Sequence, residues 1–154
     1  MKISELMTPD PVTCLPTTNL AEAAALMLQA DCGILPIVEH GKIRGVVTDR
    51  DLFIALGTRD RQPSTITVAD VMHGPLFSCS PDADVEAVLE IMKAHAIRRV
   101  PVEGFGGSVL GIVSMNDIVL AAGKTKKSML GAEVIGTLQS ICAHHHPAPR
   151  IAAA

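Results

Sequence analysis

A hydroxyl residue followed three positions later by an aspartate occurs twice in this chain, in closely similar surroundings. Residues 45–51 read Gly-Val-Val-Thr-Asp-Arg-Asp, and residues 111–117 read Gly-Ile-Val-Ser-Met-Asn-Asp. In each copy the pair follows an apolar, β-branched run that is typical of a buried strand. The pair is therefore expected where a strand gives way to a helix. The residues concerned are Thr48 with Asp51 and Ser114 with Asp117.

This spacing admits two interpretations. The hydroxyl group can cap free backbone N–H groups at the start of a helix while the carboxylate reaches back, which is a capping box. That arrangement is common and purely structural, and it would explain either copy alone. The duplication favours the second interpretation, in which a functional site occurs in two copies, because the similarity extends far beyond four residues.

The two motifs belong to an internal repeat. Equivalent residues lie 65 positions apart in Met7 with Met72, Cys14 with Cys79, Pro16 with Pro81, Met27 with Met92 and Pro36 with Pro101. Within the motifs the separation becomes 66, as between Asp51 and Asp117. The second copy therefore carries one extra residue, which we place in its hairpin turn, where an insertion costs least.

Each copy predicts the order strand, helix, strand, strand, helix. A short opening strand is expected at 12–15 and at 76–79. Hairpins are expected from 34–38 with 43–47 and from 100–102 with 109–113. The closing helices are expected to run from Thr48 to about Leu56 and from Ser114 to about Ala122.

The first helix of each copy is amphipathic. Asn19, with Glu22 three residues on, is expected to cap the first of these helices, and Asp84 the second. Their inner faces follow the helical period and comprise Leu20, Ala23, Ala24 and Met27 in one copy and Val85, Val88, Leu89 and Met92 in the other. Both helices are therefore expected to pack on a sheet.

The expected organisation is one repeat at 1–57, a linker at 58–66, a second repeat at 67–123 and a C-terminal helix with a flexible tail at 124–154. A unit of about sixty residues buries too little surface to be stable alone. The two β-α-β-β-α repeats should therefore pack with pseudo-twofold symmetry, as an α/β (α+β) fold with two related clefts. A helix at 129–142 should pack on this module or on a second subunit, through Leu130, Val134, Leu138 and Ile141.

Composition excludes several classes of function. The net charge is −3, there is no Trp or Tyr, and the only aromatic residues besides histidine are three Phe. Nucleic acid is therefore not an expected partner, because the chain supplies neither a basic surface nor stacking rings. The apolar runs are shorter than the roughly 20 residues of a membrane span, and the first residues do not open a signal peptide. A cytoplasmic protein without membrane contact is expected.

Metal and thiol chemistry find little support in the sequence. The cysteines Cys14, Cys32, Cys79 and Cys142 include no Cys-x-x-Cys pair, so no zinc or disulfide framework is indicated. Cys14 and Cys79 occupy equivalent positions and are expected to be buried as small apolar residues. Residues His144, His145 and His146 form a metal-capable run, which we interpret as a solvated tail without a second set of ligands.

The repeated motif, extended by one residue to 45–52 and 111–118, resembles that of tandem CBS domains, the Bateman module. The Met-x-x-x-Pro-Val sequence at 7–12 and the Ile-Arg-Arg-Val-Pro-Val sequence at 97–102 add to the resemblance. It covers residues 1 to about 123. The short chain is also similar to stand-alone bacterial CBS proteins of the hypoxic-response protein type.

This resemblance implies a regulatory module that binds an adenosine-containing ligand such as AMP, ADP, ATP, NAD or S-adenosylmethionine, with no other cofactor. In such modules the motif holds the ribose hydroxyls, a role that passes here to Thr48, Asp51, Ser114 and Asp117. Ile34, Pro36, Ile97 and Pro101 would line the adenine pockets. A carboxylate suits two vicinal hydroxyls, and a helix N-terminus suits phosphate. The resemblance also implies a homodimer.

The two copies are unequal in charge. Arg98 and Arg99 take the places of Gly33 and Ile34, while Arg50 is replaced by Asn116. These arginines are candidate phosphate contacts, or else ordinary surface charges, and the two clefts should differ in affinity.

No catalytic triad and no glycine-rich phosphate loop is present, so no enzymatic activity is expected. The alternative to a ligand sensor is an interaction module that dimerises without a ligand.

Overall fold

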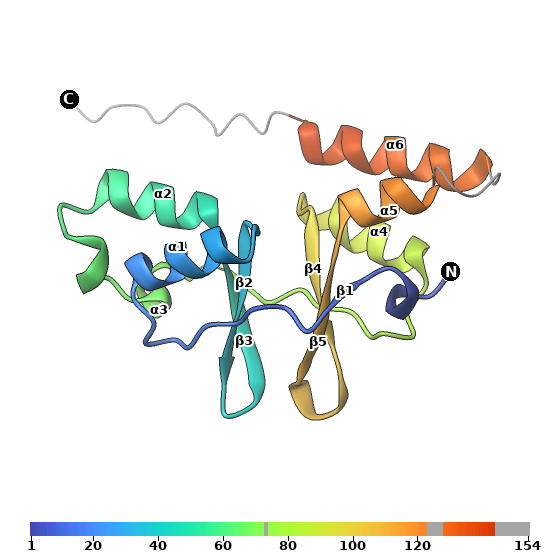
Figure 1. Cartoon of the computed structure of the whole chain (residues 1–154). Helices are drawn as coiled ribbons and strands as arrows, with labels where there is room; N and C mark the ends of the chain where they lie inside the picture. Colours follow the sequence, from blue (N-terminus) through green and yellow to red (C-terminus); the bar gives the residue numbers. More distant parts are fainter. Residues whose placement is uncertain (73, 123–127, 144–154) are drawn as a thin grey trace.

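The computed structural model describes residues 1–72, 74–122 and 128–143. The described chain forms two α/β halves side by side, each a two-stranded hairpin with helices packed beside it (Figure 1). The expected α/β fold with two repeats of the same order is confirmed. Its physical basis is that neither hairpin has enough apolar surface to form a core alone, so each repeat closes over its own amphipathic helices.

The first repeat contains the antiparallel pair β2 (Ile34–Glu39) and β3 (Lys42–Thr48). His40 and Gly41, at the turn between them, both have positive φ, which matches the twist of a tight hairpin. Helices α1 (Leu20–Gln29) and α2 (Asp49–Thr58) supply the rest of its core. The predicted hairpin is confirmed, and α2 extends two residues beyond the expected end at Leu56.

The second repeat has the same plan. β4 (Arg99–Glu103) pairs antiparallel with β5 (Val109–Ser114), across the short turn η3 (Phe105–Gly107). Helices α4 (Val85–His95) and α5 (Met115–Ala122) pack with these strands. The opening strands expected in both repeats are reduced to single parallel bridges, Cys14 with Ile37 and Cys79 with Val102.

The chain's first residues pack on the second repeat. Ile3, within η1 (Ile3–Glu5), is fully buried in the core of that repeat. β1 (Thr8–Pro9) then pairs antiparallel with β5, so the second repeat's sheet has the order β1-β5-β4. In Figure 1 the blue N-terminal segment starts beside the second repeat and crosses to the first.

The opening of the second repeat makes the reciprocal contact. After η2 (Pro63–Thr65), the short helix α3 (Val68–Val71) buries both of its valines in the core of the first repeat. The two repeats thus exchange their opening turns, and the exchange ties them together. The domain boundaries expected at residues 57, 66 and 123 stay predictions. Residues just after the second boundary, in α3, belong to the core of the first repeat.

The exchanged turns explain one glycine in each motif. A Cβ on Gly45 would overlap Met72 Sδ, and a Cβ on Gly111 would lie 2.6 Å from Met7 Sδ. At Gly111 the carbonyl oxygen of Thr8 would also lie only 2.9 Å away. Each motif therefore opens with glycine because the other repeat's methionine rests directly on its backbone.

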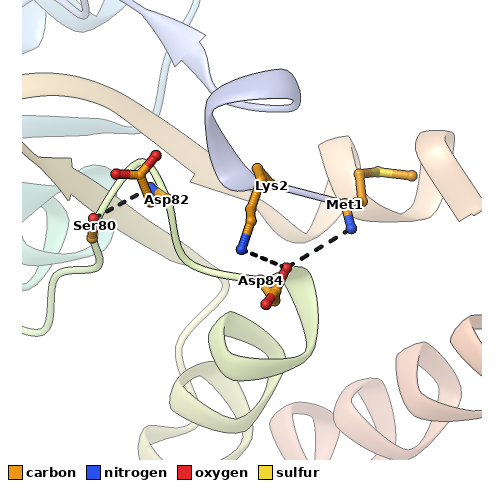
Figure 2. A network of polar contacts seen from close by, with 5 residues as sticks. All are labelled: Met1, Lys2, Ser80, Asp82 and Asp84. Atoms are coloured by element: carbon orange, nitrogen blue, oxygen red, sulfur yellow. Dashed lines mark hydrogen bonds and ion pairs between the residues drawn. The ribbon is translucent and has the colours of Figure 1, made fainter.

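The expected caps of the first helices differ in outcome. Asn19 accepts a hydrogen bond from the Glu22 backbone N–H at 2.9 Å, so this cap is confirmed. The prediction for Asp84 was wrong. Asp84 precedes α4 but makes no side-chain cap, because its carboxylate lies 3.0 Å from Lys2 Nζ and 4.0 Å from the amino group of Met1 (Figure 2).

The N-terminus replaces the missing cap with backbone groups. The Met1 carbonyl accepts from the Val85 N–H at 3.2 Å, satisfying one of the free donors at the start of α4. The expected inner face of α4 is buried at all four positions. In α1 the prediction was wrong for Ala24, which is exposed, because α1 buries a narrower stripe of Leu20, Ala23 and Met27.

Helix α6 (Ser128–Cys142) packs against α4 and α5 of the second repeat (Figure 1). Leu130 and Val134 are buried in that repeat's core, with Leu138 and Ile141 packed against it. The expected stripe therefore packs onto the module itself. The run His144, His145 and His146 lies outside the described residues.

Cys14 and Cys79 are buried, as expected, whereas Cys32 is half-buried and Cys142 exposed. Burial raises the pKa of the Cys14 and Cys79 thiols to about 11, so both stay protonated at neutral pH. Within the described residues, no helix has the length and apolar character to cross a bilayer.

Candidate ligand clefts between the repeats

The larger of two clefts between the repeats has a volume of about 610 Å³, and we call it the Thr48 cleft. The first repeat contributes the end of β3 and the start of α2, with Thr48, Asp49 and Arg50. The second repeat contributes two segments, residues 74–77 before α4, including Phe77, and residues 96–99, which lead into β4. The cleft thus combines the motif of one repeat with the strand of the other.

The second cleft, the Ser114 cleft, has a volume of about 390 Å³ and is built in the same way with the roles of the repeats exchanged. The second repeat contributes Ser114 and Asp117 from its motif. The first repeat contributes its segments 8–12 and 30–34. The pseudo-twofold symmetry expected of the fold therefore extends to its cavities.

Both motifs form complete capping boxes. At α2 the Thr48 N–H and hydroxyl both donate to Asp51 Oδ2, at 2.8 and 2.7 Å, and the Asp51 N–H donates to Thr48 Oγ1 at 3.3 Å. At α5 the Ser114 N–H and hydroxyl donate to Asp117 Oδ2 at 2.8 and 2.6 Å, with the return bond again at 3.3 Å. The structural interpretation of the motif is thus correct in both repeats.

The capping bonds leave room for a ligand. Among the described residues, the hydrogen bonds of each motif carboxylate end on Oδ2, so Oδ1 keeps its acceptor capacity. Capping and ligand binding therefore do not compete for the same oxygen. A carboxylate held this firmly is also pre-oriented for a second partner.

The two carboxylates nevertheless face different cavities. Asp117 lines the Ser114 cleft together with Ser114. Asp51 lines a smaller cavity of about 270 Å³ beside α2, with Arg59 and Val71, whereas Thr48 lines the larger cleft. Ser114 and Asp117 thus line the same cleft, as predicted. Thr48 and Asp51 are hydrogen-bonded to each other but line different cavities.

The candidate adenine residues are also distributed unevenly. Ile34, Ile97 and Pro101 line the Thr48 cleft, and Ile34 reaches the Ser114 cleft as well. Pro36 is buried and is not among the residues that line either cleft. Its carbonyl accepts from the Cys14 N–H at 3.0 Å, so it supports the strand behind the site.

All three candidate phosphate residues, Arg50, Arg98 and Arg99, line the Thr48 cleft, and Arg99 lines the Ser114 cleft too. The divide between the clefts lies near Gly33. A Cβ there would be 2.7 Å from Asp49 Oδ2, so a larger residue would push this carboxylate aside, whereas Arg99 Nη2, at 3.5 Å, would be in ordinary contact.

Sequence reasoning missed four charged or aromatic features of the clefts. Asp10 and Asp31 line the Ser114 cleft from backbone positions with φ of 47° and 48°. Asp49 lines the Thr48 cleft, and Phe77 stacks on His95 beside it, with ring centroids 3.5 Å apart. The tolerance of Asp for left-handed backbone was a signal that could have placed Asp10 and Asp31 in turns.

The family model for the CBS domain matches this sequence twice, over residues 3–58 and 68–124. The chain belongs to the CBS-domain family. Both matches contain one strand-to-helix motif and its capping box. CBS-domain pairs are typically regulatory rather than catalytic.

Stand-alone CBS proteins are among the similar proteins. The CBS domain-containing protein YhcV of Bacillus subtilis is 33% identical over 118 residues, which cover 77% of this chain and 83% of YhcV. Hypoxic response protein 1 of Mycobacterium tuberculosis is 32% identical over 109 residues, covering 70% of this chain and 76% of that protein. The resemblance to the hypoxic-response type is confirmed.

A solved structure shows a similar module with ligands. The CBS domain pair of protein MJ0100, in complex with 5-methylthioadenosine and S-adenosyl-L-methionine, superimposes with a TM-score of 0.73 at 28% sequence identity. It covers 81% of this chain and 98% of that one. A CBS pair of this fold can therefore hold adenosine ligands.

Proposed function

We propose that this chain is a regulatory sensor module that binds an adenosine-containing ligand, one of AMP, ADP, ATP, NAD or S-adenosylmethionine, in the clefts between its repeats. The observation that carries the proposal is the construction of the two clefts. Each combines the hydroxyl residue of one motif with apolar strand residues of the other repeat. The ligand-bound CBS pair of MJ0100 supports it by analogy of fold.

The proposed roles follow the chemistry of each group. Asp117 accepts from the ribose hydroxyls through Oδ1, since Oδ2 is engaged in capping. Asp51 takes the equivalent role for the Thr48 cleft, although it lies toward the smaller cavity. The adenine packs against Ile34, Ile97 and Pro101, with Pro36 behind them. A ligand shared between repeats stabilises their relative placement, which is how binding is transmitted.

Calorimetry and thermal unfolding test this proposal directly. A ligand that binds only the folded chain must raise its melting temperature by mass action. We expect saturable heat and a rise in melting temperature with at least one of adenosine, AMP, ADP, ATP, NAD and S-adenosylmethionine. If none of these ligands at millimolar concentration gave heat or raised the melting temperature, the proposal would be overturned.

A second candidate function is ligand-independent dimerisation. Phe53 on α2 is 77% exposed, and Leu120 on α5 is 66% exposed, with Ile54 and Val119 beside them. Phe53 and Val119, like Ile54 and Leu120, are equivalent residues of the repeat. This apolar face therefore has approximate twofold symmetry and can pair with a second copy. We propose a homodimer through it, and light scattering that gave the mass of one chain would contradict this.

We further propose that the module works in the cytoplasm, catalyses no reaction and binds neither nucleic acid nor membrane. These proposals rest on the composition, which supplies no basic surface and no catalytic constellation. An electrophoretic shift assay with RNA and DNA at physiological salt tests the absence of nucleic-acid binding, and we expect no shift.

A further inference from the structure

The two clefts carry charges of opposite sign. Three arginines, Arg50, Arg98 and Arg99, line the Thr48 cleft, and Asp49 is the one acidic residue among its described lining, with Asp51 in the smaller cavity beside it. Three aspartates, Asp10, Asp31 and Asp117, line the Ser114 cleft, and there Arg99 is the one basic residue described.

The difference arises at equivalent positions of the repeat. Where the Thr48 cleft has Arg98, the Ser114 cleft has Gly33, and where it has Arg50, the second motif has Asn116. The acidic residues differ in the opposite sense. Asp10 and Asp31 line the Ser114 cleft, whereas their equivalents, Pro75 and Ala96, line the Thr48 cleft and carry no charge. Together with Arg99, whose equivalent is Ile34, these four differences give the clefts opposite charge, although Asp49 of the Thr48 cleft, which is Met115 in the second motif, offsets part of it.

These charges are available to a ligand. The ion pairs between the described residues involve none of the arginines or aspartates of either cleft. Arg50, Arg98 and Arg99 are all exposed, as are Asp10 and Asp31. A concave surface of one sign concentrates ligands of the other sign and repels those of its own.

We propose that the chain sorts adenosine ligands by charge, with phosphorylated ligands in the Thr48 cleft and ligands without net negative charge in the Ser114 cleft. This inference rests on the proposed function and adds the ligand class of each cleft. Guanidinium groups bind phosphate oxygens through paired, charge-assisted hydrogen bonds. In the Ser114 cleft a phosphate would instead meet three carboxylates, whereas a neutral nucleoside or a sulfonium cation meets no repulsion.

The proposal predicts different stoichiometries. We expect AMP to bind once per chain, with an affinity that falls as salt is raised, because phosphate recognition here is electrostatic. Adenosine should bind both clefts, with little dependence on salt. Isothermal titration calorimetry at low and physiological ionic strength measures both quantities.

The Arg50→Gln/Arg98→Gln double variant tests the Thr48 cleft. Each change removes a charge while keeping much of the side chain's length, so we expect AMP affinity to fall at least about tenfold and adenosine affinity to change less than about twofold. Arg44→Gln is the matched control. Arg44 pairs with Glu39 on the surface, at 3.3 Å, and lines neither cleft, so this change should alter neither affinity.

The Asp10→Asn/Asp31→Asn double variant tests the Ser114 cleft. Asparagine tolerates the positive φ of both positions and preserves side-chain size, so the fold should be kept. We expect a second equivalent of AMP to bind this variant, while adenosine still binds in both clefts.

The outcomes separate the two proposals. If neither adenosine nor AMP binds the unmodified chain, the proposed function fails. If AMP fills both clefts of the unmodified chain equally, or the arginine variant loses adenosine and AMP alike, adenosine sensing stands and charge sorting is wrong.

Discussion

Thr48 and Ser114 make the same set of hydrogen bonds at the starts of α2 and α5, with lengths that agree within 0.1 Å. The clefts beside them nevertheless differ in volume and in sign of charge. The caps are alike because both helices need the same donors satisfied to fold. Most charged side chains of the clefts, among them Arg50, Arg98 and Asp31, are exposed, so exchanging them costs little stability and leaves them free to differ between the repeats.

The helical sides of the repeats differ as well. In the second repeat α6 packs on α4 and α5, whereas the first repeat has no equivalent described helix over α1 and α2. Part of the second core is therefore supplied by a segment outside the repeat. Symmetry in sequence does not ensure equal stability of the two halves.

The largest effect is expected from Leu130→Ala, which removes a buried side chain of α6 from the second core. The loss of buried methyl groups should lower the free energy of unfolding by about 2–4 kcal/mol. Ile135→Ala, on the exposed face of α6, is the control and should stay within about 0.5 kcal/mol. Urea unfolding measures both. Equal effects would mean that α6 does not stabilise the second repeat.

Asp117→Asn should weaken ligand binding in the Ser114 cleft by about 1.5–3 kcal/mol, which is roughly tenfold to a hundredfold. The charge-assisted acceptor is lost, while the cap should weaken by about 1 kcal/mol or less. Asp51→Asn should have a smaller effect on binding, because Asp51 lies toward the smaller cavity. Calorimetry with adenosine distinguishes them. Lower melting temperatures with unchanged affinity would make both carboxylates purely structural.

Gly111→Ala should destabilise the fold by about 1–3 kcal/mol through overpacking. The new Cβ meets the Thr8 carbonyl oxygen as well as the Met7 side chain, and backbone cannot move aside easily. Gly45→Ala meets only the flexible Met72 side chain and should cost less. Thermal unfolding of the two variants compares them, and a larger loss at Gly45 would contradict this account of the exchanged turns.

Asn19→Ala should cost about 1 kcal/mol, because it removes the cap of α1. Asp84→Ala should cost less, since Asp84 makes an exposed ion pair with Lys2 rather than a cap. Chemical denaturation of both variants gives the comparison. A loss at Asp84 equal to that at Asn19 would show that its carboxylate caps α4 in solution.

The equivalent cysteines should behave alike. An unfolded thiol ionises near its ordinary pKa of 9.0, whereas burial raises the pKa of Cys14 and Cys79 to about 11 in the folded chain. The unfolded state therefore binds fewer protons between these values, and the free energy of unfolding should fall as pH rises from 9 to 11. Cys14→Ala and Cys79→Ala should each reduce this slope similarly. An unchanged slope would place its cause elsewhere.

Much of the fold could be predicted from local patterns. The hairpins, the caps at Asn19, Thr48 and Ser114, and the stripe of α6 all follow from spacing between neighbours in the chain. Such features depend on helical and strand periods and on capping chemistry, which act over a few residues. Sequence alone also singled out the three arginines that line one cleft.

Only the tertiary structure determines which residues of the two repeats come into contact. Lys2 draws Asp84 away from its capping role, although 82 positions separate them in sequence. Asp10 and Asp31 become neighbours of Asp117 only because the first repeat's loops lie against the second motif. These meetings depend on how two cores exchange their opening turns and pack together. Periodicity within one element carries no information about that orientation, which is set by the fit of buried surfaces across the whole chain.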